Sequence, residues 1–216
     1  MNNYQYIIAS LPELAMDRMK GEKDADALIG EIKGLCSSRD VSVIEFLESG
    51  YSAGNLTADF YARARSSRCP FIREWFGFDL NVRNAKVRYL NSALGREKDK
   101  DVIAAGDPDK DAETEFAEAQ ELGTVLAGNN ILDRERGIDS LYWKKADELS
   151  LFHYFDLTAI LGFIVKLKII DRWMKLDDAR GREMFRELVD EVRGTFKGVE
   201  FSGSPRTGSG RERPGY

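Results

Sequence analysis

The chain has 216 residues, of which 43% are hydrophobic and 32% are charged, and its formal net charge is −5 at pH 7. This length is sufficient for one substantial hydrophobic core or two small ones. The composition is that of a soluble globular protein, and it excludes an intrinsically disordered chain and a membrane-embedded one.

The first residues predict a short strand or an extended arm, because Tyr4 to Ile8 is rich in tyrosine and isoleucine and Leu11-Pro12 closes it. The start has neither a basic region nor a long apolar region, so it is not a secretory signal. Cys36 and Cys69 lie far apart and form no CxxC pair. We expect two reduced, buried thiols in a cytoplasmic protein, with a single disulfide as the alternative.

Two helices are predicted in the first 50 residues. Asp24 precedes apolar residues at spacings of four and three, which share one helical face: Leu28, Ile32, Leu35. Asp40 is expected to cap a second, short helix that ends at Gly50. Residues 50–54 then form a turn.

The longest periodic segment begins after Pro70 and continues to Leu94, with Gly95 as its terminator. It predicts one long helix, or two helices joined near Gly77. The charged stretch 98–110 contains Gly106-Asp107-Pro108 and has no apolar period. We expect a loop there.

The C-terminal half predicts further helices. One ends near Gly128, another covers about 138–149, and a third is capped by Asp156 and continues to Met174. The last of these includes the longest apolar stretch, which carries two lysines and therefore indicates a core helix instead of a membrane span. A final helix over about 177–194 is expected to pair with it as an antiparallel hairpin.

These elements predict a mainly α fold built from one or more helical bundles. Residues 1–197 are expected to form the helical domain, and a subdivision near 98–111 stays open. Residues 198–216 are rich in glycine, serine, proline and arginine, and we expect them to be disordered.

No pattern of a catalytic, cofactor or metal site is found in the sequence. His153 is the only histidine, lies among aromatic residues, and is interpreted as a packing residue. Phosphate-binding glycine loops of the GxxxxGK[ST] or GxGxxG kind are missing, and the acidic run 107–111 lacks the spacing of an EF-hand. We therefore expect a non-enzymatic protein, without a cofactor, that binds other macromolecules.

Charge is distributed unevenly along the chain. Residues 61–100 contain ten lysines and arginines against four acids, whereas residues 101–160 contain five bases against fourteen acids. This asymmetry either steers a charged partner or reflects two segments that pack together and neutralise one another. Nucleic-acid binding by the basic 61–100 segment is the alternative function, and the isoelectric point of about 5.2 argues against it.

A cluster of polar residues on the long predicted helix indicates specific hydrogen bonds. Two asparagines stand close together among basic residues, although asparagine has a weak helix propensity. The candidate partner-binding residues are Asn81, Arg83, Asn84, Lys86 and Arg88. Hydrogen bonding within the bundle is the competing interpretation.

The segment Phe76-Gly77-Phe78-Asp79-Leu80-Asn81-Val82-Arg83-Asn84 resembles an uncharacterised family of bacterial proteins encoded with V-type ATPases. The likeness extends to Tyr4–Leu14 at the start and, near the end, to 155–157, 164–173, 176–177 and 181–185. That family is distantly similar to the C subunit of V-type ATPases (d in eukaryotes), a helical socket between the rotor shaft and the membrane ring.

The resemblance implies a non-catalytic helical subunit or accessory factor that binds the central stalk or the ring of such an ATPase. The chain is too short for the complete funnel of three bundles, so an accessory or reduced version is expected. It implies no catalytic residue, and it would place the protein in the cytoplasm or peripherally at the inner face of the membrane.

Overall fold

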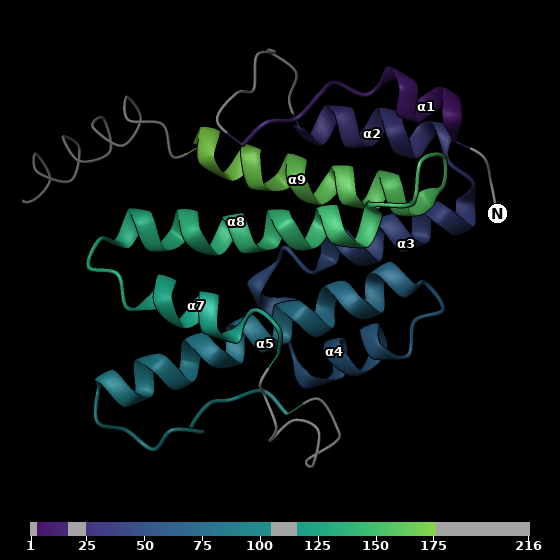
Figure 1. Cartoon of the computed structure of the whole chain (residues 1–216). Coiled ribbons are helices and arrows are strands. Elements are labelled where there is room, and N and C mark those ends of the chain that lie inside the picture. The colour runs from purple at the N-terminus through teal and green to yellow at the C-terminus, as the bar shows by residue number, and fades with distance from the viewer. Residues whose placement is uncertain (1–3, 17–24, 105–115, 176–216) are drawn as a thin grey trace, which may run out of the picture. The chain divides into compact units, whose positions relative to one another are not determined.

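The computed structural model describes residues 4–16, 25–104 and 116–175. Their regular secondary structure is helical, which confirms the mainly α fold (Figure 1). The chain divides into two compact units, residues 1–172 and 173–216, and only residues 173–175 of the second are described. Within the described residues, each helix is too short or too polar to cross a membrane.

The N-terminal segment is helical, so the predicted strand is wrong. Helix α1 covers Gln5–Ser10 and ends where Leu11 becomes extended before Pro12. Tertiary contacts override the strand preference of this segment. The backbone N–H of Tyr4 donates to the carbonyl of Phe155 at 2.7 Å, and the Tyr4 hydroxyl donates to Asp40.

Helices α2 (Ala25–Leu35) and α3 (Ser38–Ser49) lie close to their predicted positions. Leu28 and Ile32 are buried, but Leu35 is 62% exposed at the end of its helix. Ser37 caps α3, not Asp40, because the Ser37 hydroxyl accepts the N–H of Asp40 at 3.3 Å. The helix ends at Gly50, as predicted.

The 3₁₀ turn η1 (Ala53–Asn55) and helix α4 (Ala58–Arg65) connect α3 to the long helix. Helix α4 was not predicted from the sequence. Thr57 caps it through a 3.3 Å bond from the N–H of Phe60. It packs along the first half of α5, and Phe60, Tyr61 and Ala64 are its buried residues.

Helix α5 (Pro70–Ala93) is continuous through Gly77. Proline at its first position suits a helix start. Its end forms a Schellman motif, in which the N–H of Arg96 bonds to the carbonyl of Asn91 at 2.8 Å. Gly95 adopts the left-handed φ of 64° that this motif requires. Residues 98–104 then form a loop, as predicted, and residues 105–110 lie outside the described part.

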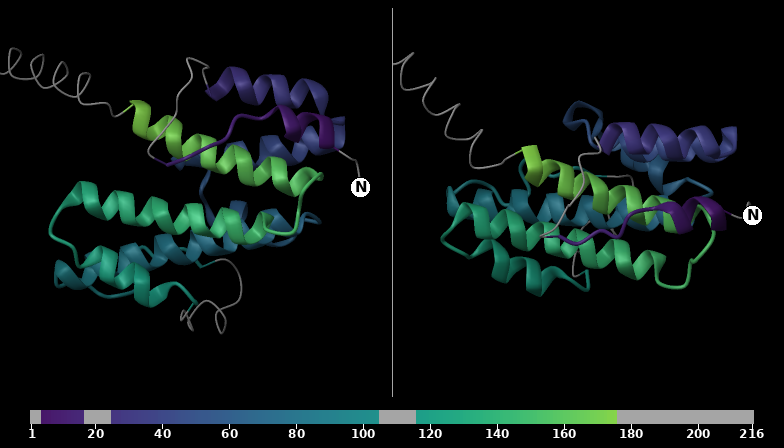
Figure 2. Two further views of the ribbon diagram at one scale, coloured as in Figure 1. Left: turned by 45° about the horizontal axis from the view of Figure 1, so that its top comes forward. Right: turned by 90° about the horizontal axis from the view of Figure 1, so that it is seen from above.

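Helices α7 (Ala119–Leu126), α8 (Ile131–Ser150) and α9 (Leu157–Lys175) complete the described chain. One core cluster joins α5, α7 and α8: Phe78, Val82, Leu122, Leu126, Ile138, Leu141. Helices α8 and α9 run side by side (Figure 2). They approach closely at Gly162, where an added Cβ would lie 3.0 Å from the Ser150 hydroxyl.

Asp156 caps α9 as predicted, because its Oδ1 accepts the N–H of Thr158 at 2.9 Å. The helix predicted over 177–194, its hairpin with α9, and the tail 198–216 lie outside the described residues. The two cysteines are free and half-buried, so no disulfide joins them. Burial raises the pKa of both thiols.

Candidate functional site

The candidate partner-binding residues lie in the middle of α5, and most of them have internal partners. Arg83 Nε donates to Asp79 at 2.7 Å, and Arg88 Nε donates to Asp99 at 2.7 Å. Lys86 Nζ lies 3.7 Å from a carboxylate oxygen of Glu135 on α8. Arg83 and Lys86 keep 41% and 36% of their side chains exposed.

Asn84 binds the loop that follows α5. Its amide nitrogen donates to the carbonyl of Ile103 at 3.0 Å, and its amide oxygen accepts the N–H of Ile103 at 3.0 Å. Asn91 donates to the carbonyls of Lys98 and Lys100 at 3.2 and 2.7 Å. Asn81 is only half-buried and has no such role in the described residues.

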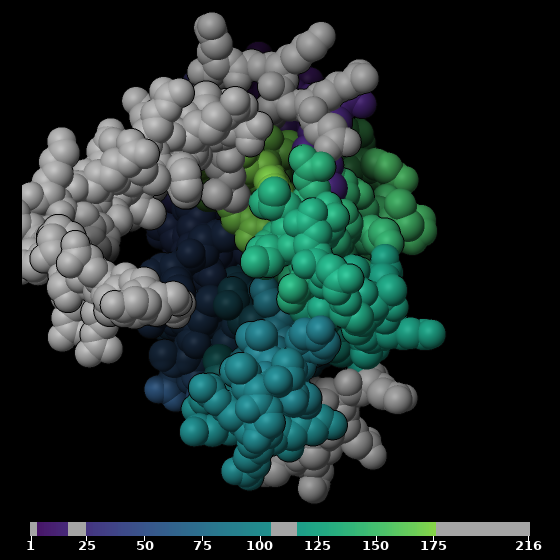
Figure 3. Space-filling model, turned by 90° about the vertical axis from the view of Figure 1, so that its left-hand side faces the viewer, coloured from purple at the N-terminus to yellow at the C-terminus, as the bar shows by residue number. Residues whose placement is uncertain are grey.

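Residues 84, 88 and 91 are spaced by four and three, so they form one polar stripe along α5. The stripe fastens residues 98–103 to the helix, and Figure 3 shows the end of α5 and this loop as one continuous teal surface. The specific hydrogen bonds that the sequence indicated therefore exist for Asn84, whereas none is found for Asn81 among the described residues. Their acceptors belong to the loop of the same chain, and contact with a partner stays a prediction.

A buried carboxylate that the sequence reasoning did not single out connects three helices. Asp79 on α5 is 6% exposed and accepts hydrogen bonds from Tyr61 on α4 and Tyr142 on α8, both at 2.7 Å. Arg83 supplies a third bond and an opposite charge. Burial, followed by the negative charge of Asp79, raises the pKa of both tyrosines. The signal in the sequence was the position of Asp79 between the apolar residues Phe78 and Leu80 of the predicted helix, which indicates a buried acid.

The basic and acidic segments do pack against each other. Helix α5 of the basic segment contacts α7 and α8 of the acidic one, and Lys86 and Glu135 form an ion pair between them. Other acids of α7 and α8 pair with lysines and arginines of α8 and α9, for example Glu121 with Lys144 and Asp139 with Arg172. Much of the asymmetry along the sequence is therefore balanced locally.

The turn between α8 and α9 presents large apolar side chains to solvent. We call residues 151–155 the aromatic turn. Leu151 is 58% exposed, Phe152 81%, Tyr154 64% and Phe155 50%. Two backbone hydrogen bonds hold this turn. The N–H of His153 donates to the carbonyl of Ser150 at 2.9 Å, and the N–H of Tyr4 donates to the carbonyl of Phe155 at 2.7 Å.

His153 has a structural contact within this turn. Its Nδ1 lies 2.6 Å from Oδ2 of Asp156, the residue that caps α9. The histidine is half-buried, and this bond ties the turn to the first turn of α9. No group of three or more metal-binding side chains occurs within the described ranges, while the acidic run 107–111 lies outside them.

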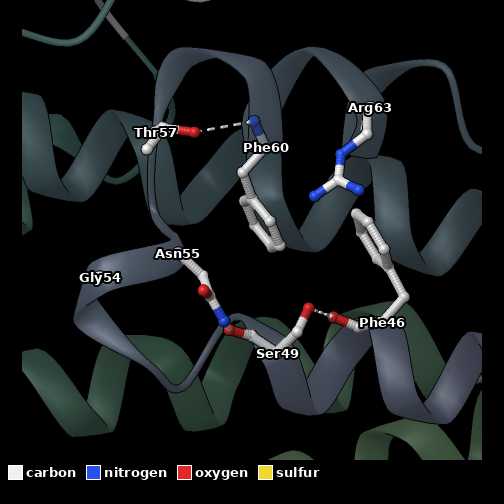
Figure 4. Close-up of a pocket in the computed structure, with 7 residues that line it drawn as sticks. All are labelled: Phe46, Ser49, Gly54, Asn55, Thr57, Phe60 and Arg63. Atoms are coloured by element: carbon white, nitrogen blue, oxygen red, sulfur yellow. Dashed lines mark hydrogen bonds between the residues drawn. The ribbon is translucent and has the colours of Figure 1, made fainter.

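A cleft of about 430 Å³ opens between α3, η1 and α4 (Figure 4). Seven residues line it: Phe46, Ser49, Gly54, Asn55, Thr57, Phe60, Arg63. The guanidinium of Arg63 lies over the rings of Phe46 and Phe60, at 5.7 and 6.0 Å from their centroids. The sequence reasoning did not identify this cleft, because α4 itself was not predicted.

A family model described as "Protein of unknown function (DUF2764)" matches residues 48–195. The chain belongs to this family. The match covers more than half of the chain, and it includes the cleft residues from Ser49 onward, the polar stripe of α5 and the aromatic turn. No curated protein matches the chain, and no solved structure does.

Proposed function

We propose that this chain is a non-catalytic helical subunit or accessory factor of a V-type ATPase, and that it binds the central stalk or the membrane ring. The likeness around Leu80-Asn81-Val82-Arg83-Asn84 to proteins encoded with such ATPases motivates the proposal. A helical chain suits this role, because helices of a stalk or ring pack against other helices through ridges and grooves.

The aromatic turn is the observation that carries the binding function. Monomeric proteins rarely expose large contiguous apolar patches, and such patches mark interaction surfaces. Here four large apolar side chains within five residues are at least half exposed. The few residues that carry most of the binding energy at interfaces are enriched in tryptophan, tyrosine and arginine, and aromatic rings bury a large apolar area.

The turn is fixed before any partner arrives. The Tyr4–Phe155 and His153–Ser150 backbone bonds and the His153–Asp156 contact hold its backbone. A rigid surface loses less conformational entropy on binding than a mobile one. We therefore assign the main contact to the aromatic turn, in place of the α5 residues, because Arg83, Asn84, Lys86 and Arg88 already have partners within the chain.

The test is an affinity purification of the tagged full-length chain from its native cells at near-physiological salt, followed by mass spectrometry. The wild type is compared with Phe152→Ser/Tyr154→Ser and with a control at the other end of α8, Ile131→Ser/Leu132→Ser. The control removes two side chains that are 71% and 61% exposed. We expect V-type ATPase subunits with the wild type and the control, and their loss with the turn variant.

Two results would contradict different parts of the proposal. Recovery of no ATPase subunit with the wild type would refute the assignment to a V-type ATPase. Equal recovery with the turn variant would leave that assignment intact but refute the contact surface. Recovery of nucleic acid would favour the alternative through the basic 61–100 segment, which a gel shift at low and moderate salt then checks.

A further inference from the structure

The cleft between α3 and α4 is lined by Arg63, which forms no ion pair with an acid of the described residues. Arg63 is exposed, and its guanidinium is held over Phe46 and Phe60, whose stacked rings lie 5.0 Å apart. By contrast, Arg83 and Arg88 on α5 each form a 2.7 Å ion pair. The aromatic rings therefore position Arg63 without using its hydrogen-bond donors.

The guanidinium is suited to one chemical group in particular. It stays charged at any physiological pH, and its planar fork of N–H donors matches the two oxygens of a carboxylate. Because the rings already restrict the side chain, less conformational freedom is lost when an anion binds. Arg63 is thus a preorganised carboxylate receptor at the edge of the cleft.

The same cleft is lined by a candidate acceptor, the side-chain amide of Asn55. The amide nitrogen of Asn55 donates to the carbonyl of Ser49 at 3.0 Å, which fixes the amide plane. In the part of the chain that the structure describes, the Asn55 amide oxygen accepts no hydrogen bond. Figure 4 shows Asn55 and Arg63 on either side of the Phe60 ring. The cleft thus combines a cationic donor, an aromatic floor and a carbonyl acceptor.

We propose that this cleft binds an acidic residue within a peptide segment of a partner protein. Arg63 donates to the side-chain carboxylate, Asn55 accepts a backbone N–H of the same segment, and neighbouring apolar side chains contact Phe46. Charge complementarity selects the acid. A peptide fits better than a free metabolite, because Gly54, Asn55 and Thr57 are exposed, whereas small-molecule sites enclose most of their ligand.

This inference goes beyond the proposed function and stands independently of it. The residues that carry it come from α3, η1 and α4, whereas the aromatic turn joins α8 to α9. It needs no V-type ATPase, and a failed affinity purification would leave it untouched.

The test is an NMR titration of the ¹⁵N-labelled full-length chain. The probe is acetyl-Leu-Glu-Leu-amide, and the matched probe replaces its glutamate by glutamine. We expect saturable shifts at Gly54, Asn55 and the Nε–H of Arg63 with the acidic probe. The glutamine probe should bind about tenfold more weakly or worse, because it lacks the negative charge and one of the two acceptor oxygens that the guanidinium fork contacts.

Three variants distinguish binding by the guanidinium of Arg63 from a general attraction to positive charge. Arg63→Gln should weaken the acidic probe about tenfold, and Arg63→Lys should lie between it and the wild type. Arg68→Gln is the control, since Arg68 is also exposed and basic but does not line the cleft. The dispersion of the amide spectrum checks that each variant is folded.

Three outcomes would overturn the proposal. One is the absence of saturable shifts at the cleft up to about 10 mM probe, which would place the Kd above that concentration. Another is equal binding of the glutamate and glutamine probes. The third is that Arg68→Gln weakens binding as much as Arg63→Gln, which would indicate a diffuse surface attraction.

Discussion

Asp79 shows how one buried charge organises the packing of three helices. A carboxylate with 6% exposure loses most of its hydration, and burial is tolerated only where hydrogen bonds and opposite charge replace the water. Tyr61, Tyr142 and Arg83 supply both. Because the two tyrosines come from α4 and α8, the carboxylate fixes how these helices sit on α5.

Removing this carboxylate should destabilise the protein strongly. We expect Asp79→Ala to lower the free energy of unfolding by about 2–4 kcal/mol, because it leaves two tyrosine hydroxyls and a half-buried guanidinium without their acceptor. Urea denaturation measures the change. Glu74→Ala, an exposed acid on the same helix, is the control and should stay within about 0.5 kcal/mol of the wild type. Equal effects of the two substitutions would contradict the structural role of Asp79.

The tyrosines around Asp79 should make the fold sensitive to alkaline pH. The pKa of Tyr61 and of Tyr142 is raised in the folded state, whereas a tyrosine of the unfolded chain has a pKa of about 10. Their contribution to stability is thus complete below that pH. Above it, unfolding releases protons and the free energy of unfolding falls as pH rises.

Stability measured by urea denaturation from neutral pH to about pH 11 tests this linkage. We expect the decline above about pH 10 to be shallower in Tyr61→Phe/Tyr142→Phe, which has no hydroxyl to ionise at these positions. An unchanged slope in the double variant would show that other groups cause the decline.

The Asp79 cluster could not be predicted from the sequence. Its two tyrosines lie 18 and 63 residues away, and only tertiary packing brings them to the carboxylate. Local chemistry was more informative for Asn84, because asparagine within a helix indicates a hydrogen-bonding requirement. The sequence did not reveal that its partner is the backbone of Ile103, which both donates to and accepts from the Asn84 amide.

Among the elements, the long helices α5 and α9 were predicted well, the start of α8 was placed seven residues too late, and the short helices α1 and α4 were missed. Helices α5 and α9 carry apolar residues at helical spacing over 24 and 19 residues, and Gly95 and Asp156 mark an end and a start. Helix α4 has only eight residues, too few for a clear period. Helix α1 has six and is fixed by contacts to Phe155 and Asp40 that lie far along the chain.

The loop after α5 should loosen when its fastening residue is removed. Asn84→Ala deletes both bonds to Ile103 and leaves the Ile103 N–H without its acceptor. We expect a loss of about 1–2 kcal/mol and faster hydrogen exchange at the Ile103 amide. Asn81→Ala, at a half-buried position three residues earlier, is the control. Unchanged exchange at Ile103 in the Asn84 variant would contradict the fastening.

Two glycines in the same part of the fold should respond to alanine with opposite signs. A Cβ on Gly50 would collide with the ring of Phe76, so Gly50→Ala should cost about 1–3 kcal/mol. Gly77 lies exposed within α5 with open space around it, so Gly77→Ala should stabilise the protein by about 0.5–1 kcal/mol. Thermal unfolding of both variants measures the effect. Stabilisation by both would mean that the Phe76 ring moves freely.

At the scale of the whole molecule, the structure separates surfaces that serve the fold from surfaces that do not. The basic residues of α5 are largely used internally, and the acids of α7 and α8 find nearby bases. The aromatic turn and Arg63 are among the described groups that this internal pairing does not use. Sequence charge counts could not distinguish these cases, because they do not show which charges meet after folding.

The aromatic turn should be dispensable for folding although it is needed for binding. Phe152 and Tyr154 are 81% and 64% exposed, so Phe152→Ser/Tyr154→Ser removes little buried apolar surface. We expect its Tm to stay within about 2 °C of the wild type. Asp156→Ala, in contrast, removes the cap of α9 and its contact with His153, and should cost about 1 kcal/mol, or about 2–4 °C. If the turn variant melted as low as Asp156→Ala, the turn would be part of the core, and loss of partner recovery could not be read as loss of a binding surface.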